Sequence, residues 1–456
     1  MDEFFESVES EYSSGLAGEL VVPGDKSISH RALILGALTV GETIARGLLE
    51  SEDVICTANA LETLGAKIVR KGSGLWSIQG VGIGGFRQPD NVIDCGNSGT
   101  SVRLLMGAVS TSFINVTFTG DNSLRKRPMD RVLIPLTEFG TSFSTNVDNK
   151  LPIHVSGSEE PIPISYKLPV PSAQVKSAIL LGGLNARGRT SVVETESSRD
   201  HTEKMLKAFG ANVIIENKPN YSEISIDGFP SLRPIEIKVP GDISSASFPI
   251  AAACMVPGSK ILIKDVGVNP LRDGFLVSLI EMGANINIMN KREIAGELLA
   301  DIRVIYSPNL KGIEVPEKRS ARMIDEYPIL SMVAATAKGS TIMKGVRELR
   351  YKESDRIEAI AKGLKGNGVK VSVEEDTLIV TGVPGTIFEG GSEINASNDH
   401  RIAMSFLCLG LVSKKSITVH GTKSIKTSFP NFVELMTSIG AVLKSIRNNK
   451  PHFFLD

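Results

Sequence analysis

The hydrophobic residues of this 456-residue chain recur in one arrangement six times. In each copy an amphipathic helix is followed by glycine, and in all but the fifth, where Asn367 precedes Gly368, the residue before the glycine is apolar. A run of alternating apolar and polar residues comes next, which is the period of a strand. A glycine directly after a helix favours a left-handed backbone that ends the helix. The six glycines in this position are Gly65, Gly140, Gly210, Gly283, Gly368 and Gly440.

A second feature recurs upstream of each of these glycines. A short strand runs into a turn of small polar residues and then into an apolar helix. The six copies read VVPGDKSISHRALILGAL, DCGNSGTSVRLLMGAV, LPVPSAQVKSAILLGGL, VPGDISSASFPIAAAC, RMIDEYPILSMVAATA and INASNDHRIAMSFLCL. Each unit therefore predicts strand–helix–strand–helix–strand–strand. Because the chain is too long for one core, we expect an α/β protein of two domains, each with three βαβαββ repeats.

Composition narrows the class of protein. The chain is 41% hydrophobic and 22% charged, which is typical of a globular protein. Fifty basic and 51 acidic side chains leave a formal net charge of −1, which argues against a dedicated nucleic-acid-binding protein. The four cysteines show no paired spacing, so neither a disulfide framework nor a zinc site is expected. The acidic N-terminus lacks a signal-peptide pattern and the apolar stretches are short, so we expect a cytoplasmic protein without membrane contact.

Several polar turns place cations at helix starts, where anions bind. In PGDKSISHR, Lys26, Ser27 and Arg31 lie at the start of an apolar helix. In GNSGTSVR, Gly99 lets the backbone approach a ligand closely. Arg127 belongs to the basic run LRKRP. Each segment also has a structural interpretation, as a capped helix, a tight turn or a solvated surface.

The third unit contributes hydrogen-bonding groups. Ser172 and Gln174 in PSAQVKSA suit substrate hydroxyls, and Lys176 in the same helix suits an anion. Ser198 and Arg199 in ESSRDHTEK stand just before a helix. The acids of DHTE resemble a capping box, which is a structural reason for their presence. Ser198 and Arg199 lack such a reason and are candidates for ligand contact.

The second half of the chain supplies titratable groups. Asp325 lies at the start of an apolar helix, where it is either a general base or a partner of the helix dipole. Lys352 and Arg356 are four residues apart and would share a helix face, with Glu353 between them. Arg401 lies at another helix start. An array of this kind suits small substrates that carry several phosphate and carboxylate charges.

These segments resemble the 5-enolpyruvylshikimate-3-phosphate (EPSP) synthase family from about residue 15 to the C-terminus. PGDKSISHRAL, GNSGTSVRLL, KRPMDRV, PSAQVKSA, IDEYPIL, KESDRI and NDHRIAMS occur in the order typical of the family. The resemblance implies the enolpyruvyl transferase fold, an inverse α/β barrel of two domains with three repeats each. It implies that residues 1–25 and 241–456 form a phosphoenolpyruvate-clamping domain. Residues 26–240 would form the domain that binds shikimate 3-phosphate.

The resemblance also implies roles for the matching positions. The residues expected around shikimate 3-phosphate are Lys26, Ser27, Arg31, Ser172, Gln174, Ser198, Arg199, Asp325 and Lys352. Those expected around phosphoenolpyruvate and its transferred carbon are Lys26, Gly99, Arg127, Glu353, Arg356 and Arg401. Lys426 lies one position away from the late lysine of the family and receives no role. The strings AQVKSA, DEYP and SSRDHTE resemble the second sequence class of the family, which includes members poorly inhibited by glyphosate.

The reaction implied is an addition–elimination at phosphoenolpyruvate in which the C–O bond breaks. The 5-hydroxyl of shikimate 3-phosphate loses a proton while the methylene carbon gains one, so two titratable groups are needed. We expect Asp325 to act as the base at the hydroxyl, and Glu353 with Lys26 to handle the methylene proton. We expect a monomer that needs no metal or cofactor.

Three alternatives compete with this interpretation. The first is the related transferase that uses UDP-N-acetylglucosamine, most members of which carry a cysteine in a mobile loop; the corresponding stretch here, TFTGDNSLRKRPMD, has none. The second is a nucleic-acid-associated protein, because RNA 3′-phosphate cyclases share a related repeat. An aromatic content of 5% opposes it, since stacking platforms would be scarce. The third is an inactive relative, although every expected catalytic residue is present.

Overall fold

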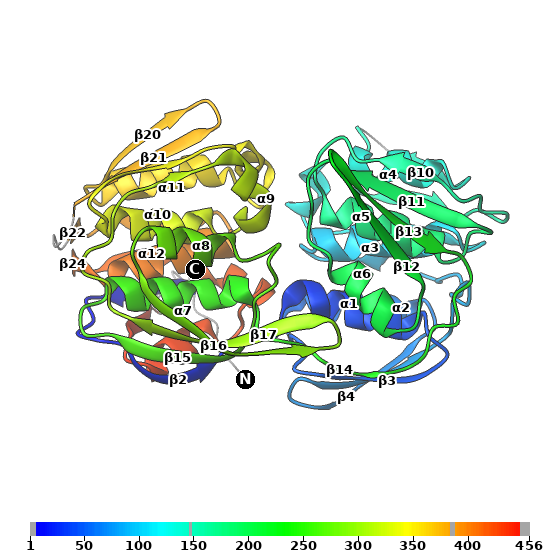
Figure 1. The fold of residues 1–456 in the computed structure, drawn as a ribbon, viewed down its shortest axis with the longest axis horizontal. Helices are drawn as coiled ribbons and strands as arrows, with labels where there is room; N and C mark the ends of the chain where they lie inside the picture. The colour runs from blue at the N-terminus through cyan, green and yellow to red at the C-terminus, as the bar shows by residue number, and fades with distance from the viewer. Residues whose placement is uncertain (1–5, 146–147, 384–387, 447–456) are drawn as a thin grey trace, which may run out of the picture.

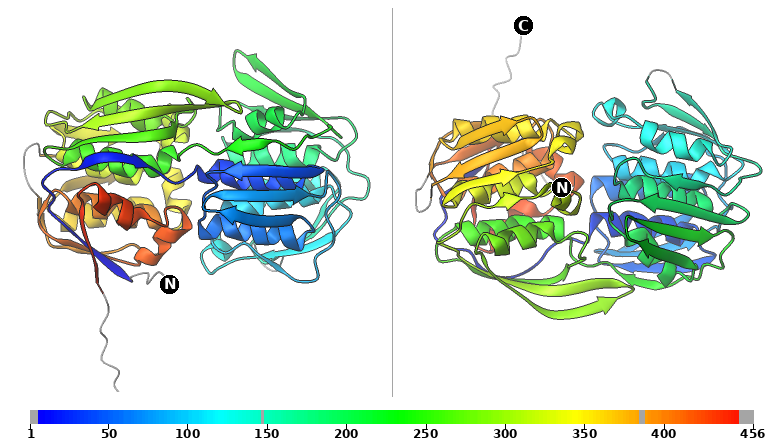
Figure 2. Two further views of the ribbon diagram at one scale, coloured as in Figure 1. Left: turned by 90° about the horizontal axis from the view of Figure 1, so that it is seen from below. Right: turned by 45° about the horizontal axis from the view of Figure 1, so that its top comes forward.

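The computed structural model describes residues 6–145, 148–383 and 388–446. The chain forms two lobes that lie side by side, as Figure 1 shows. The first lobe contains helices α1 to α6, and the second contains α7 to α13. Figure 2 shows the two lobes from below and tilted with the top forward, with β2, near the N-terminus, in the second lobe.

The first lobe contains three four-stranded sheets. In sheet order, their strands are β14 (Glu236–Lys238), β3 (Gly41–Arg46), β5 (Leu75–Gly80) and β4 (Lys67–Gly72); β6 (Ile93–Asp94), β7 (Asn115–Thr119), β9 (Ile153–Ser156) and β8 (Ser142–Thr145); and β10 (Ser165–Lys167), β11 (Arg189–Glu194), β13 (Tyr221–Asp227) and β12 (Val213–Lys218). The helices are α1 (Lys26–Ala37), α2 (Glu52–Thr63), α3 (Gly99–Ser110), α4 (Asp130–Thr137), α5 (Ala173–Gly183), α6 (His201–Ala208) and the short η1 (Leu124–Lys126).

The second lobe repeats this plan. Its four-stranded sheets are β2 (Ala17–Val21), β15 (Lys260–Gly267), β17 (Glu297–Ile305) and β16 (Asn285–Ile294); β18 (Glu314–Val315), β19 (Gly339–Met343), β21 (Thr377–Gly382) and β20 (Lys370–Glu374); and β23 (Glu393–Asn395), β25 (Ile417–His420), β1 (Ser7–Glu11) and β26 (Val442–Ile446). Strands β22 (Phe388–Gly390) and β24 (Ser413–Lys415) form an additional pair. The helices are α7 (Ile243–Met255), α8 (Gly274–Glu281), α9 (Ser320–Met323), α10 (Tyr327–Thr336), α11 (Arg356–Gly366), α12 (His400–Gly410), α13 (Phe432–Ser438), and the short η2 (Glu317–Arg319), η3 (Arg347–Tyr351) and η4 (Thr422–Thr427).

All six four-stranded sheets have the same topology. In each, the first two strands in sheet order are parallel and the remaining neighbours are antiparallel. The six glycines predicted after helices all have positive φ, between 83° and 107°. The predicted fold class of six βαβαββ units is therefore confirmed.

Two units exchange their first strands, which the repeat pattern did not reveal. Strand β2 precedes α1 in the chain but pairs with β15 in the second lobe, and β14 precedes α7 but pairs with β3 in the first lobe. The sixth unit is completed by β1, from the other end of the chain. The chain consequently crosses between the lobes twice, at residues 22–25 and 239–242.

The two crossing segments are held against each other. The amide of Asp25 donates to the carbonyl of Pro240 at 2.7 Å, and the amide of Asp242 donates to the carbonyl of Pro23 at 2.8 Å. A Cβ on Gly24 would lie 1.9 Å from the carbonyl oxygen of Gly47, so glycine is required there. The crossings are thus tightly packed at the point where the lobes join.

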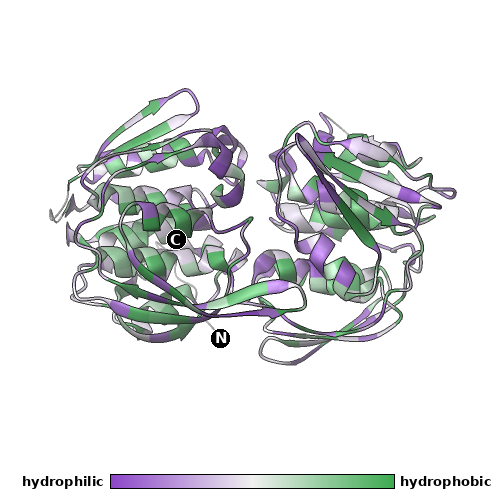
Figure 3. Cartoon of the chain, viewed as in Figure 1, coloured by the Kyte–Doolittle hydropathy of each residue, from purple (hydrophilic) through white to green (hydrophobic). Residues whose placement is uncertain are grey.

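The buried hydrophobic side chains form two separate clusters. One contains residues from Ile28 to Val239, and the other contains residues 8–22 together with residues 243–441. Figure 3 shows hydrophobic residues concentrated on the inner helices of each lobe. Each lobe therefore buries its own core. The division into domains at residues 25 and 241 stays a prediction, which these clusters support.

Candidate active site

The polar turns of the repeats form the starts of helices in both lobes. Asp25, Ser98 and Ser172 accept hydrogen bonds from backbone amides at the starts of α1, α3 and α5. Asp355 and Asp399 do the same for α11 and α12. Capping satisfies backbone amides that have no partner inside the helix. The turn residues lie at the N-terminal end of each helix, where the helix dipole is positive.

Asp325 is the first group on which the two lobes converge. It lies just before α10 in the second lobe, and its Oδ2 accepts from Nη2 of Arg199 of the first lobe at 2.8 Å. Its Oδ1 lies 3.1 Å from Nζ of Lys352 and 3.2 Å from Nη1 of Arg356. Burial by itself raises the pKa of Asp325, but Lys352, Arg199, Arg401 and Arg356 outweigh it and hold the pKa well below its usual range. Asp325 is therefore ionised in the free protein.

Glu353 is the second such carboxylate. Its Oε2 lies 2.5 Å from Nη2 of Arg356, and its Oε1 lies 3.5 Å from Nη2 of Arg127, across the lobe boundary. Burial raises the pKa of Glu353, but Arg356 and Arg127 outweigh it and hold the pKa well below its usual range. Nε of Arg127 is buried and has no hydrogen-bond partner among the described residues.

Two arginines of the second lobe are fixed by buried acids. Arg356 is 1% exposed, and its Nε donates to Oδ2 of Asp399 at 2.8 Å. Asp399 also accepts from the amide of Arg401 at 2.9 Å. Nη1 of Arg401 donates to Oγ of Ser244 at 2.6 Å and lies 3.5 Å from Oε1 of Glu326. Because these guanidinium groups are held by fixed partners, their positions are set before any ligand binds.

Lys26 is placed by two aspartates. Its ammonium forms an ion pair with Asp53 of α2, and its amide donates to Oδ2 of Asp242 at 3.3 Å. Burial raises the pKa of Asp53, an effect that Lys26 only partly offsets. Asp53 also lies within electrostatic reach of Glu353 and Arg127. Lys26 is thereby held on the side of the first lobe that faces Glu353.

The remaining candidates from the first unit and from α5 are tied together by hydrogen bonds. Arg31 is buried, and Nη1 of its guanidinium donates to the carbonyl of Ser27 at 2.9 Å. Burial lowers the pKa of Arg31 to about 10. Gln174 accepts from Arg103 at 2.7 Å and donates to Thr100 at 2.9 Å. These contacts orient the groups at the starts of α1, α3 and α5.

Gly99 lies where a side chain would collide with two arginines. A Cβ at this position would be 2.8 Å from Nη1 of Arg103 and 3.2 Å from Nη1 of Arg127. Any larger residue would thus displace guanidinium groups at the start of α3. The glycine keeps this part of the site open.

Three local interpretations of the sequence were wrong. Lys176 is buried and pairs with Glu194 and Glu203, so it is not available to a substrate anion. The proposed capping box at DHTE does not form, because Asp200 makes no side-chain cap and Glu203 pairs with Lys176. Lys352 does not share a helix face with Arg356, because α11 begins at Arg356 and Lys352 is extended.

Sequence reasoning missed the residues that hold the cations in place. They are Asp53, Ser244 and Asp399, each of them buried. Asp399 carried a signal, since it immediately precedes an apolar helix and so reads as an N-cap. Its second partner, Arg356, is 43 residues away in the chain and could not be inferred from local pattern.

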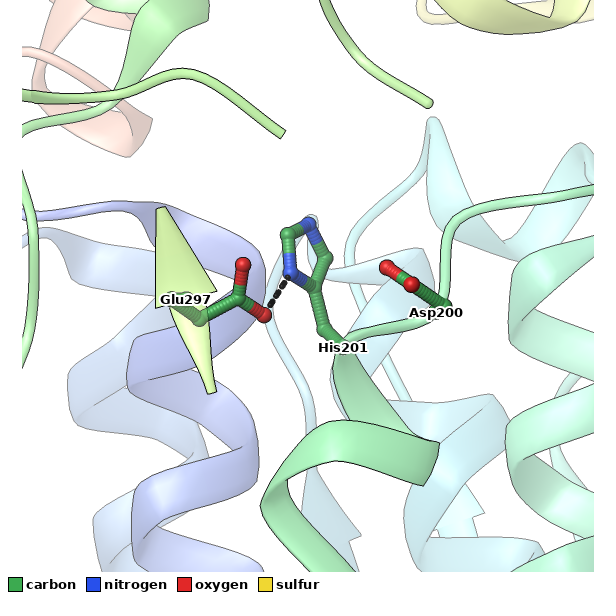
Figure 4. A group of neighbouring side chains, drawn as sticks. All are labelled: Asp200, His201 and Glu297. Atoms are coloured by element: carbon green, nitrogen blue, oxygen red, sulfur yellow. Dashed lines mark hydrogen bonds and ion pairs between the residues drawn. The ribbon is translucent and has the colours of Figure 1, made fainter. Parts of the chain in front are cut away.

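A separate acidic group lies where the lobes meet. One ligand atom from each of Asp200, His201 and Glu297 lies within 4.8 Å of the others (Figure 4). Nδ1 of His201 is 2.7 Å from Oε1 of Glu297, and Lys204 lies 3.2 Å from Asp200 and 3.6 Å from Glu297. Asn269 donates to Asp200 at 2.6 Å. Lys204 already supplies the positive charge that a cation would bring, so we assign no metal to this group.

No helix among the described residues is long and apolar enough to cross a membrane.

The architecture is that of the enolpyruvyl transferases. The crystal structure of the enolpyruvyl transferase NikO from Streptomyces tendae superposes with a TM-score of 0.74 over 97% of this chain and 99% of its own, at 16% identity, which shows the fold alone.

The family is shown by closer matches. A family profile described as EPSP synthase (3-phosphoshikimate 1-carboxyvinyltransferase) matches residues 11–436, and this chain belongs to that family. Proteins named 3-phosphoshikimate 1-carboxyvinyltransferase from Dinoroseobacter shibae and Cereibacter sphaeroides are 54% and 55% identical to it, each over 94% of this chain and 96% of the relative. The solved EPSP synthase of Acinetobacter baumannii is 42% identical, with a TM-score of 0.86 over 97% of this chain and 100% of its own. The predicted family and carboxyvinyl transfer are confirmed.

Proposed function

We propose that this chain transfers the enolpyruvyl group of phosphoenolpyruvate to the 5-hydroxyl of shikimate 3-phosphate at the boundary between its two lobes. One observation carries the proposal: two ionised carboxylates, Asp325 and Glu353, lie among arginines contributed by both lobes. Such a concentration of cations suits substrates that carry phosphate and carboxylate groups.

The reaction requires proton transfer at two different atoms. The 5-hydroxyl oxygen attacks C2 of phosphoenolpyruvate while C3 gains a proton, which gives a tetrahedral intermediate. The C2–O bond to phosphate then breaks and C3 loses a proton, which gives the enol ether and inorganic phosphate. A base is needed at the hydroxyl, and both a proton donor and a proton acceptor are needed at C3.

Asp325 is assigned as the base at the hydroxyl. Its pKa is low in the free protein because Lys352, Arg199 and other cations surround it, although burial acts in the opposite direction. A bound phosphorylated substrate would neutralise part of that positive charge, since Lys352 and Arg199 are themselves assigned to shikimate 3-phosphate. The pKa of Asp325 would then rise, and the carboxylate would become a better base at the moment it is needed.

Glu353 and Lys26 are assigned to the methylene proton. They belong to different lobes, and Asp53, the partner of Lys26, lies within electrostatic reach of Glu353. The ammonium of Lys26 carries a proton that it can give, and ionised Glu353 can take one. The two groups therefore supply the opposite transfers that the addition and elimination steps require.

The arginines are assigned to phosphoenolpyruvate and to the charge that develops on it. Arg356 and Arg401 are held by Asp399, Ser244 and Glu326, so they need little reorganisation when substrate binds. Arg127 approaches from the first lobe beside Gly99. Preorganised donors around a leaving phosphate typically contribute about 10²–10³-fold each to the rate.

Shikimate 3-phosphate is assigned to the first lobe. The expected contacts come from Ser27 and Arg31 of α1, from Ser172 and Gln174 of the α5 turn, and from the loop before α6 that carries Ser198 and Arg199. Because Asp325 and Lys352 complete this set from the second lobe, the substrate would stabilise contact between the lobes and exclude water. We also propose a cytoplasmic monomer that needs neither metal nor cofactor.

The test is phosphate release from phosphoenolpyruvate with each of two acceptors. We expect release with shikimate 3-phosphate and none with UDP-N-acetylglucosamine. Release with the sugar nucleotide alone would overturn the acceptor assignment. Absence of release with either acceptor, from protein whose thermal unfolding is cooperative, would contradict catalysis at this site. Light scattering of the same sample tests the monomer.

A further inference from the structure

Lys176 is a lysine that the proposed chemistry does not use. It lies in the first turns of α5 and is 1% exposed. Its ammonium is 2.7 Å from Oε1 of Glu203 and 3.1 Å from Oε1 of Glu194, and both of these side chains are also buried. Burying a lysine with two carboxylates costs desolvation energy that an apolar packing would not, so the ion-pair group calls for a reason beyond stability.

One set of hydrogen bonds from this group holds the loop before α6. Lys176 donates to the carbonyl of Ser198 at 3.2 Å. Oε2 of Glu194, whose other oxygen contacts Lys176, accepts from the hydroxyl of Ser198 at 2.8 Å and from its amide at 3.3 Å. The backbone and the side chain of Ser198 are therefore fixed by Lys176 and Glu194 together, and Arg199 follows directly in the chain.

A second set of hydrogen bonds, next to this group, reaches Arg31. Ser177, the residue after Lys176, and Thr202, the residue before Glu203, share a hydrogen bond of 2.6 Å. Arg31 donates from Nη2 to Ser177 at 2.7 Å and from Nε to Thr202 at 2.7 Å. The ion pair between Lys176 and Glu203 thus joins α5 and α6 at the point where both contact Arg31.

We propose that Lys176, with Glu194 and Glu203, is a positioning group that sets Arg31, Ser198 and Arg199 in their binding arrangement before shikimate 3-phosphate arrives. The inference rests on the proposed function, because it assumes that these three residues contact that substrate. Lys176 itself touches no substrate, since it is buried behind the loop that it holds. Its effect falls on the affinity for shikimate 3-phosphate.

The test compares Lys176→Met with Lys207→Met, which removes the same charge from an exposed position on α6. The dissociation constant for shikimate 3-phosphate is measured by calorimetry without phosphoenolpyruvate, and kcat is measured at saturating concentrations of both substrates. We expect Lys176→Met to weaken binding at least about tenfold, as the loss of charge-assisted hydrogen bonds predicts, with a smaller effect on kcat. We expect Lys207→Met to bind as the wild type does.

Hydrogen exchange separates positioning from general stability. We expect amides 195–200 of free Lys176→Met to exchange faster while the strands of the second lobe stay unchanged. If Lys176→Met does not fold, the double variant Lys176→Met/Glu203→Gln takes its place, because it removes one buried charge of each sign. Wild-type affinity in whichever variant folds, or faster exchange throughout the first lobe with unchanged affinity, would overturn the proposal. Failure of the wild type to bind shikimate 3-phosphate would instead refute the proposed function.

Discussion

The charged side chains of a few residues determine the chemistry of the candidate site. Asp325 and Glu353 are partly buried carboxylates kept ionised by several cations each, and those cations are also the groups assigned to the substrates. The free protein therefore contains an internally paired site. A substrate must replace carboxylate–arginine contacts with its own, so binding and a rise in the basicity of the carboxylates are coupled.

Glu353→Gln tests the assignment of the methylene proton. The amide keeps the size of the side chain but cannot exchange a proton, so we expect kcat to fall by about 10²–10⁴-fold. Binding of shikimate 3-phosphate should persist, because its assigned contacts are elsewhere. Steady-state phosphate release and calorimetry measure the two effects. Glu358→Gln, at an exposed position of α11, is the matched control. Turnover of Glu353→Gln near that of the wild type would remove Glu353 from the mechanism.

The lowered pKa of Glu353 also predicts how stability depends on pH. In the unfolded chain the carboxylate of Glu353 binds a proton near pH 4.5, and in the folded chain it does so only at lower pH. Ionised Glu353 therefore stabilises the fold above pH 4.5. This contribution is lost as the pH falls below that value through the folded pKa. We expect the Tm of Glu353→Gln to lie below that of the wild type at neutral pH, and the difference to shrink as the pH falls below 4.5. A constant difference in Tm across this range would contradict the assignment.

At the scale of elements, each repeat joins a helix that starts at a polar turn to a glycine-ended helix, and five of the six starts, all but that of α10, have a side-chain cap. The caps place polar residues at one end of the helices, and the glycines turn the chain back into the sheet. Gly368 shows this requirement in isolation, because its φ is 83° and a Cβ there would meet nothing within 4 Å. Only backbone conformation, and no steric contact, demands glycine at this position.

Gly368→Ala should therefore destabilise the fold through backbone strain alone. We expect the free energy of unfolding to fall by about 1–2 kcal/mol, the cost of a left-handed backbone in a residue with a Cβ. Chemical denaturation followed by circular dichroism measures this change. Gly72→Ala is the control, because Gly72 does not have positive φ and an added Cβ would make only an ordinary contact with Leu75 at 3.9 Å. Equal effects of the two substitutions would show that the conformation of Gly368 is not responsible.

At the scale of the whole molecule, the lobes are joined by two backbone crossings and by several side-chain contacts. Near the crossings, Arg272 lies 2.8 Å from Asp25 and 3.5 Å from Asp242, the N-caps of α1 and α7. The hairpin of β16 and β17 extends from the second lobe towards the first, as Figure 1 shows, and Glu297 at its turn contacts His201. These contacts hold the lobes together around the site.

The buried contact of Glu297 should matter more for this arrangement than an exposed one. Removing one partner of a buried hydrogen bond costs about 1–3 kcal/mol, whereas an exposed ion pair contributes about 0–1 kcal/mol. We expect Glu297→Ala to separate the lobes in the free protein, seen as a larger radius of gyration by X-ray scattering, and to raise KM for both substrates. Glu348→Ala breaks the exposed pair with Arg131 and is the control. An unchanged radius in Glu297→Ala would show that this contact is not needed to hold the lobes together.

Local preference made much of this molecule predictable from its sequence. The six glycines, the polar turns and the apolar periods depend on residues within a few positions of each other, and they were sufficient to predict six repeats and the helix starts that carry Lys26, Asp325 and Arg401. The family motifs added the reaction. Interactions over such short separations are largely independent of the rest of the fold.

Partners distant in the chain could be assigned only in three dimensions. The burial of Lys176 and the pairing of Arg199 with Asp325, 126 residues apart, leave no local signature. The exchange of β2 and β14 between lobes has none either, and only the family resemblance implied it. Each depends on which sheet edge or helix end lies opposite, and on how far water is excluded there. A cation at a helix start looks the same in the sequence whether it faces a substrate, as proposed for Lys26, or a buried carboxylate, as found for Lys176. Packing decides between the two, because burial sets the energy of an unpaired charge.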